Sequence, residues 1–170
     1  MSLILSGTDG VQGNSGAIVS GTAVSASGTS VDFTGIPSWV KRITVMLSGV
    51  STNGTNELLI QVGDSGGIEN TGYISTSANT INGSTSAAAS STAGFIMRSV
   101  LAANTVSGHM VITLVGANEW VSSHTAKGGT TFNICGAGDK TLSDTLTQVR
   151  ITTVGGTNTF DAGTINILYE

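Results

Sequence analysis

The sequence predicts an all-β protein: an antiparallel β-sandwich of the jelly-roll-like type, with an extended N-terminal arm. Three observations predict this fold. β-branched and other apolar residues recur at every second position in several segments. Clusters of Gly, Asn, Asp and Ser separate those segments. No segment shows the i, i+3, i+4, i+7 apolar spacing of an amphipathic helix.

The alternating segments are expected to be half-buried strands, because successive side chains of a strand point to opposite faces of its sheet. Turns are predicted at residues 52–55, 64–67, 128–129 and 155–158, and Trp39 is predicted to be a core residue at a strand entry. The alternating sets are Ile43, Val45 and Leu47; Leu58, Ile60 and Val62; Met110, Ile112 and Leu114; Val149, Ile151 and Thr153; and Ile165, Ile167 and Tyr169.

The remaining segments divide the chain into two parts. Residues 1–21 are Gly-rich and lack periodicity, so we expect an extended arm that serves attachment or a subunit contact. Residues 22–170 are expected to form the sandwich domain. The Ala- and Ser-rich segment 84–93 is the best helix candidate. It is predicted to be a loop, because Ser and Thr compete for backbone hydrogen bonds and the segment has no apolar anchor.

The composition excludes several classes of protein. Charged residues are 9% of the chain, against about 25% in an ordinary soluble domain. The net charge is −4 and the few cations are scattered, which argues against a nucleic-acid partner. No apolar run approaches the length of about 20 residues that a membrane span needs, so no membrane insertion is expected. The single cysteine, Cys135, is predicted to be a buried free thiol.

One motif resembles a catalytic sequence. The stretch Gly63-Asp64-Ser65-Gly66-Gly67 is similar to the nucleophile region of trypsin-like serine proteases. Such a serine needs a histidine base that a carboxylate orients. The two histidines, His109 and His124, both follow Ser65, and no other part of the protease signature is present. A Gly-rich turn is the favoured interpretation, and a serine hydrolase that uses Ser65 is a remote alternative.

Metal and cofactor sites are not expected. His109, Glu119 and His124 are spaced so that a hairpin could bring them together, but satisfied or exposed histidines are the favoured interpretation. No P-loop or dinucleotide fingerprint is present. The sequence therefore predicts a protein that is not an enzyme, with no catalytic residues, no metal and no cofactor.

Two residues are candidates for contact with a partner or a glycan: Trp120 and His124. Trp120 lies in the stretch Asn118-Glu119-Trp120-Val121, flanked by polar positions, where a tryptophan can serve as a sugar platform or a subunit contact. Packing beneath a hairpin is the favoured interpretation for Trp120. More generally, surfaces rich in Ser, Gly, Thr and Asn suit contacts with neutral partners such as polysaccharides or neighbouring subunits.

Residues 36–67 and 149–170 resemble the C-terminal β-domain of tail-fibre-like and other structural proteins of tailed phages. The stretches that carry the resemblance begin with Ile36-Pro37-Ser38-Trp39 and end with Ile167-Leu168-Tyr169-Glu170. The opening Leu3-Ile4-Leu5-Ser6-Gly7 is similar to the start of such proteins.

This resemblance implies a virion protein on the particle surface, at the tail or the head, that contacts other virion proteins and often forms a homotrimer. A tail-fibre-type adhesin that binds a host polysaccharide or receptor is the first expectation. The chain has no long shaft or repeat region. A short adhesin tip is therefore one alternative, and a capsid decoration (cement) protein that stabilises the head is another.

Overall fold

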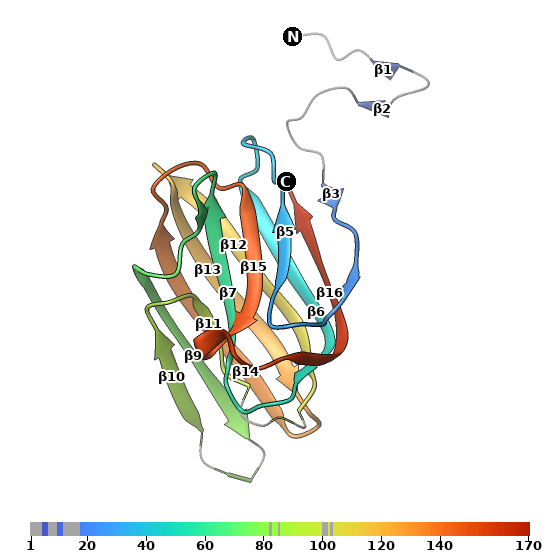
Figure 1. Cartoon of the computed structure of the whole chain (residues 1–170), viewed down its shortest axis with the longest axis vertical. Coiled ribbons are helices and arrows are strands. Elements are labelled where there is room, and N and C mark those ends of the chain that lie inside the picture. Colours follow the sequence, from blue (N-terminus) through green and yellow to red (C-terminus); the bar gives the residue numbers. More distant parts are fainter. Residues whose placement is uncertain are drawn as a thin grey trace.

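The computed structural model describes residues 5–6, 10–11, 18–81, 83–84, 86–99, 102 and 104–170. The all-β prediction is confirmed: two antiparallel sheets pack face to face as a β-sandwich (Figure 1). The one helical element in the described residues is a single 3-10 turn, η1 (Val154–Gly156). No helix in this part of the chain is both long and apolar enough to pass through a bilayer.

The larger sheet has nine strands in the described part of the chain. From one edge to the other they are β10 (Ala87–Ser91), β9 (Tyr73–Ile81), β14 (Phe132–Thr141), β13 (Glu119–Gly128), β12 (Val106–Gly116), β6 (Arg42–Thr52) and β16 (Phe160–Tyr169), followed by the short strands β3 (Val19–Ser20) and β4 (Val24–Ser25), which both pair with β16. Strands β12, β13 and β14 form a meander.

The smaller sheet has five strands among the described residues. Their order is β11 (Phe95–Met97), β7 (Leu58–Asp64), β15 (Gln148–Thr153) and β5 (Val31–Thr34), and β8 (Gly67–Ile68) pairs with the end of β7. Two further short strands, β1 (Leu5–Ser6) and β2 (Gly10–Val11), pair with each other.

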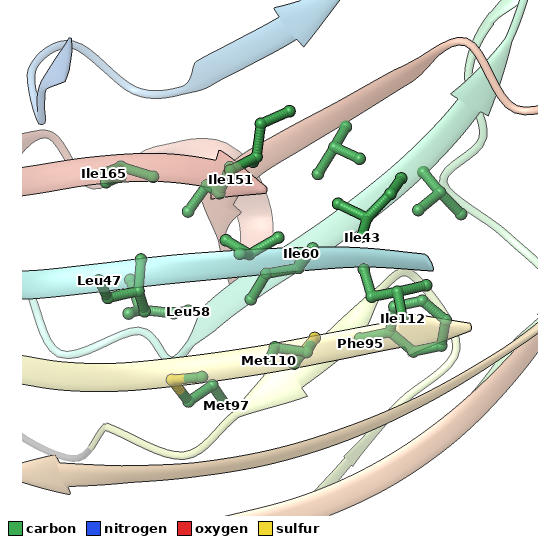
Figure 2. Packing of buried hydrophobic residues seen from close by; sticks show 14 of the residues in the cluster. Ile43, Leu47, Leu58, Ile60, Phe95, Met97, Met110, Ile112, Ile151 and Ile165 are labelled. Carbon is green, nitrogen blue, oxygen red and sulfur yellow. The ribbon is translucent and has the colours of Figure 1, made fainter. Parts of the chain in front are cut away.

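The core lies between the sheets, where the predicted alternating residues meet (Figure 2). Ile43 of β6, Ile60 of β7 and Ile112 of β12 are fully buried there. The predicted burial of the alternating residues is thus confirmed for these three strands. Strand β7 departs from it, since Leu59 and Gln61 on its other face are buried too. The smaller sheet is therefore covered on part of its outer face as well.

A glycine permits the close pairing of β6 with β16. The register between these strands shifts on both sides of Ala162. Gly163 lies in that irregular stretch with a φ of 98°, and a Cβ there would lie 2.5 Å from the backbone nitrogen of Val50. A side chain would clash at this point, so the strand contact requires glycine.

Two predictions about local structure are wrong. Within the segment 84–93 the structure forms strand β10 rather than a loop, because five residues pair with β9 and tertiary pairing overrides the weak strand propensity of Ala and Ser. Cys135 is exposed rather than buried. Its neighbours Ile134 and Gly136 face the interior of the sandwich, and the pleat of β14 therefore turns Cys135 outward.

The arm prediction, residues 1–21, is only partly within the described residues. Residues 1–4, 7–9 and 12–17 lie outside them. The last part of the segment belongs to the sandwich, since β3 pairs with β16 and the Gly21 amide donates to the Ile167 carbonyl at 2.8 Å. Trp39 is partly buried against the core and lies 6.0 Å from the Tyr169 ring, in accord with its predicted place at a strand entry.

Candidate functional site

A polar pocket of about 350 Å³ lies on the smaller sheet, on the side away from the core. It forms because β7 and β15 run side by side and the segments before β5, after β8 and before β11 surround them. Its volume is within the range of small-molecule sites in proteins. The described lining residues are Thr29, Ser30, Leu59, Gln61, Ile68, Asn70, Ala93, Arg150, Thr152, Thr153, Gly155 and Gly156.

Gln61 is a buried polar residue in this pocket, with 7% of its surface exposed. Its side-chain amide nitrogen donates to the Ala93 carbonyl at 2.8 Å, which fixes the orientation of the amide. The carbonyl oxygen of the same amide is the acceptor that Gln61 can offer to a ligand. A buried amide is costly unless it is hydrogen-bonded, so an incoming hydroxyl that donates to this oxygen is favoured.

Arg150 supplies the one charge among the described lining residues. Its guanidinium forms a two-pronged pair with the Asp32 carboxylate: Nε donates to Oδ1 at 2.8 Å and Nη2 donates to Oδ2 at 2.7 Å. Hydrogen bonding to Asp32 raises the pKa of Arg150 above its ordinary value, so the cation persists at every physiological pH. Because Asp32 offsets that charge, the pocket is electrically neutral while Arg150 retains unused N–H donors.

Hydroxyl groups and tight turns complete the pocket. Thr152 donates to the Thr29 carbonyl at 2.8 Å and so ties β15 to the segment before β5. Thr153 is 1% exposed, and its hydroxyl has no hydrogen-bond partner in the described structure. Gly155 and Gly156 have φ values of 78° and 64°, which a tight turn requires and glycine permits.

This arrangement suits a neutral ligand rich in hydroxyl groups. Donors from Arg150 and acceptors from Gln61 lie beside the apolar side chains of Leu59 and Ile68. A few placed polar groups on a partly apolar surface are the usual composition of a ligand pocket. Among the described lining residues, no nucleophile is paired with a base.

The two predicted contact residues, Trp120 and His124, lie elsewhere. Both belong to the inward face of β13, with 2% and 5% of their surface exposed. Neither side chain can therefore touch a glycan or a partner on the surface of the folded chain, and their assignment as contacts is corrected. The polar neighbours of Trp120 suggested a contact, but in a strand the adjacent residues face the opposite side. Trp120 packs in the core, as the favoured interpretation predicted.

His124 bonds a serine, but not Ser65. Its Nε2 lies 3.0 Å from the Ser77 hydroxyl inside the sandwich. Burial lowers the pKa of His124 to about 4, so the ring is neutral at neutral pH. Ser65 is exposed in the turn after β7.

The Asp64-Ser65-Gly66-Gly67 motif is explained by the turn that it forms. The Asp64 carboxylate accepts hydrogen bonds from the Ser143 hydroxyl at 2.6 Å and from the Gly66 amide at 2.7 Å. These bonds, Ser143 first, hold the pKa of Asp64 below its ordinary value. An aspartate that bonds the backbone two residues on is a common turn device.

His109, Glu119 and His124, which the sequence analysis considered and disfavoured as a metal site, do not come together. His109 is exposed on the outer face of β12, whereas His124 points inward from β13. In the part of the chain that the structure describes, no three His, Cys, Asp or Glu side chains are grouped closely enough to hold a metal ion.

Sequence analysis missed the pocket because its residues are distant from one another in the chain. They come from residues 29–30, 59–70, 93 and 150–156. One signal was present: Gln61 interrupts an otherwise apolar run in β7, Leu58 to Val62. A polar residue in such a run indicates a strand that is buried on both faces and uses that position for a specific hydrogen bond. No family model, curated protein or solved structure matches this chain.

Proposed function

We propose that this chain is a structural protein of a tailed-phage particle and that its sandwich binds a neutral glycan of the host surface. The observation that carries the proposal is the neutral pocket in which Gln61 and Arg150 present fixed hydrogen-bonding groups. The resemblance of residues 36–67 and 149–170 to the β-domain of tail-fibre-like proteins supports the same conclusion. In this proposal the chain acts by adhesion and catalyses no reaction.

The physical chemistry of the pocket favours a sugar over a charged ligand. An anion would meet Arg150, but Asp32 already occupies two of its donors and repels negative charge. A cation would have only neutral oxygen atoms of Gln61, Asn70 and the threonines as its neighbours. A sugar donates and accepts hydrogen bonds through each hydroxyl, and its C–H face can pack on Ile68.

The test is binding of the recombinant chain to an array of neutral bacterial polysaccharides, followed by titration calorimetry with the best binder. We expect Gln61→Leu to weaken binding at least tenfold, because a side chain of similar size then lacks both the donor to Ala93 and the acceptor for the ligand. Gln148→Leu is the matched control: Gln148 lies on β15 of the same sheet and is not part of the lining. Equal binding by wild type and Gln61→Leu would refute the assignment of the pocket.

The outer face of the larger sheet favours a second candidate, a decoration protein of the phage head. Ile74 and Val121 are exposed there, at 69% and 38%, on either side of a shallow hollow over Ala137. A broad face with few charges suits a fixed contact with a capsid lattice. Labelling the protein in purified particles distinguishes the candidates: a few copies at the tail support the adhesin, and a high copy number over the head supports decoration.

A further inference from the structure

The open edges of the two sheets are protected to very different degrees. Strand β11 is an edge of the smaller sheet, and hydroxyls from the opposite sheet accept hydrogen bonds from one amide of this strand and from the amide of the residue that follows it. Ile96 donates to Ser75 at 2.9 Å and Arg98 donates to Ser77 at 3.1 Å. The opposite edge, β5, is four residues long and carries the charged Asp32. Short length and charge are the usual ways in which proteins prevent edge strands from pairing with other chains.

The far edge of the larger sheet is protected by its shortness. It consists of β3 and β4, each two residues long, which share the edge of β16. Two-residue strands offer too few backbone groups to guide the addition of another strand. In the described part of the chain, three of the four sheet edges are therefore protected against the addition of another strand.

Strand β10 has none of these protections. It is five residues long, Ala87–Ser91, and in the described part of the chain it pairs on one side only, with β9. In Figure 1 it forms the outermost strand of the larger sheet. It contains no lysine and no proline, its register with β9 is regular, and Ala88 and Ser90 are exposed. A regular, exposed strand of this kind presents free N–H and C=O groups to another strand.

The absence of charge around β10 indicates what kind of strand it accepts. No charged residue occurs anywhere from Tyr73 to Met97, which covers β9, β10 and β11. When a strand pairs antiparallel with a copy of itself about a two-fold axis, a charged residue at or next to the axis lies close to its own copy, so like charges would repel each other there. An uncharged strand of small side chains removes that repulsion and allows close approach.

We propose that β10 is a self-association edge: a second copy of this chain adds its own β10 antiparallel to it. The two nine-stranded sheets then become one continuous sheet across a two-fold axis, held by backbone hydrogen bonds. The interface is isologous, and its side chains are alanine and serine. This inference does not depend on the glycan pocket, which lies on the other sheet. It differs from the three-fold arrangement that the phage resemblance implies.

The test is the mass of the purified chain in solution, measured by light scattering over a range of concentrations. We expect wild type to reach twice the 17.0 kDa mass of the chain, and the double variant Ala88→Lys/Ser90→Lys to remain a monomer. Ser123→Lys/Thr125→Lys is the matched control, because it places the same charges at the same spacing on an exposed face of the central strand β13. This control is expected to dimerise as wild type does.

Hydrogen exchange supplies a readout that needs no variant. In wild type, the β10 amides that point away from β9 should exchange more slowly as concentration rises, while exchange in the turn at residues 65–66 stays constant. If wild type remains a monomer and β10 exchange does not depend on concentration, the proposal is wrong. It is equally wrong if the chain associates but the lysine pair in β10 leaves its mass unchanged.

Discussion

His124 reaches Ser77 across Gly136, and the three residues lie side by side on β13, β9 and β14. The Ser77 hydroxyl donates to the Cys135 carbonyl at 3.2 Å and accepts from the Arg98 amide at 3.1 Å. Nε2 of His124 lies 3.0 Å from the same hydroxyl. Ser77 and His124 are 2% and 5% exposed, so this hydrogen bond lies inside the sandwich, where it links β9 to β13 across β14.

The first prediction concerns acid stability. Burial lowers the pKa of His124 to about 4, from 6.5 for an unperturbed histidine, so protonation favours the unfolded chain. The contribution of His124 to the free energy of unfolding should be complete above pH 6.5. It should decrease as the pH falls toward about 4, by about 3 kcal/mol in total. Urea unfolding across this range measures the loss.

His124→Gln isolates the effect of this histidine, because the free energy of unfolding of this variant should no longer decrease through His124 protonation between pH 6.5 and about 4. His109→Gln, at an exposed position of β12, should keep the wild-type profile. The lowered pKa values of Asp64 and Glu69 act at lower pH: the stability that these carboxylates contribute is present above their ordinary pKa and is lost as the pH falls through their lowered values. Identical pH profiles for wild type and His124→Gln would contradict the prediction.

The second prediction concerns the glycine beneath the imidazole. A Cβ at Gly136 would lie 2.5 Å from Cε1 of His124 and 2.4 Å from the Thr76 carbonyl oxygen. Gly136→Ala should therefore push His124 away from Ser77 and destabilise the fold by about 1–3 kcal/mol, the usual cost of overpacking. Denaturant unfolding measures this change. Ala137→Ser, on the exposed side of the same strand, is the control and should be neutral.

The third prediction tests the protection of the β11 edge. Ser75→Ala leaves the buried Ile96 amide without its acceptor, which should cost about 1–3 kcal/mol and speed hydrogen exchange at Ile96. Ser123→Ala, at an exposed site on β13, should change the free energy of unfolding by less than about 0.5 kcal/mol. Unchanged exchange at Ile96 in Ser75→Ala would show that the hydroxyl does not protect this edge.

The fourth prediction concerns the hydroxyl of Tyr73, which is 1% exposed and lies between the sheets. It accepts from the Val62 amide at 2.8 Å and lies 3.0 Å from the Glu69 carbonyl, to which it donates. Tyr73→Phe should cost about 1–3 kcal/mol, because the Val62 amide and the Glu69 carbonyl then lose their partner. Tyr169→Phe, at the partly exposed end of β16, is the matched control. In thermal unfolding, Tyr73→Phe should have a clearly lower Tm than Tyr169→Phe.

The fold was largely predictable because burial on one face of a strand imposes a two-residue period. That period placed Ile43, Ile60 and Ile112 in the core correctly. It failed for β10, because its Ala and Ser residues show no alternation of apolar and polar side chains. Pairing with β9 is what places this segment in a strand. The errors for Trp120 and Cys135 have a different cause: their faces follow from the alternation along β13 and β14, which the polarity of the neighbouring residues does not reveal.

The pocket could not have been predicted from the sequence, since no local pattern joins Gln61 to Arg150. They become neighbours only because β7 and β15 pair, with these two residues opposite each other in the register. Asp32 joins them through a second pairing, of β5 with β15. A site that is assembled by strand pairing can be predicted only when the register of the strands is known, and the register depends on the whole sheet.

The pairing of β6 with β16 has a consequence for how the chain folds while it is being synthesised. Ile43 pairs with Tyr169 and Leu47 pairs with Ile165, so the hydrogen-bonding partners for one edge of β6 are synthesised much later than β6 itself. Until residues 160–169 leave the ribosome, the nascent chain holds a long apolar strand with half its backbone groups unused. The larger sheet is therefore completed on this side only after residues 160–169 have been synthesised, and until then β6 has an open edge that can contact other chains.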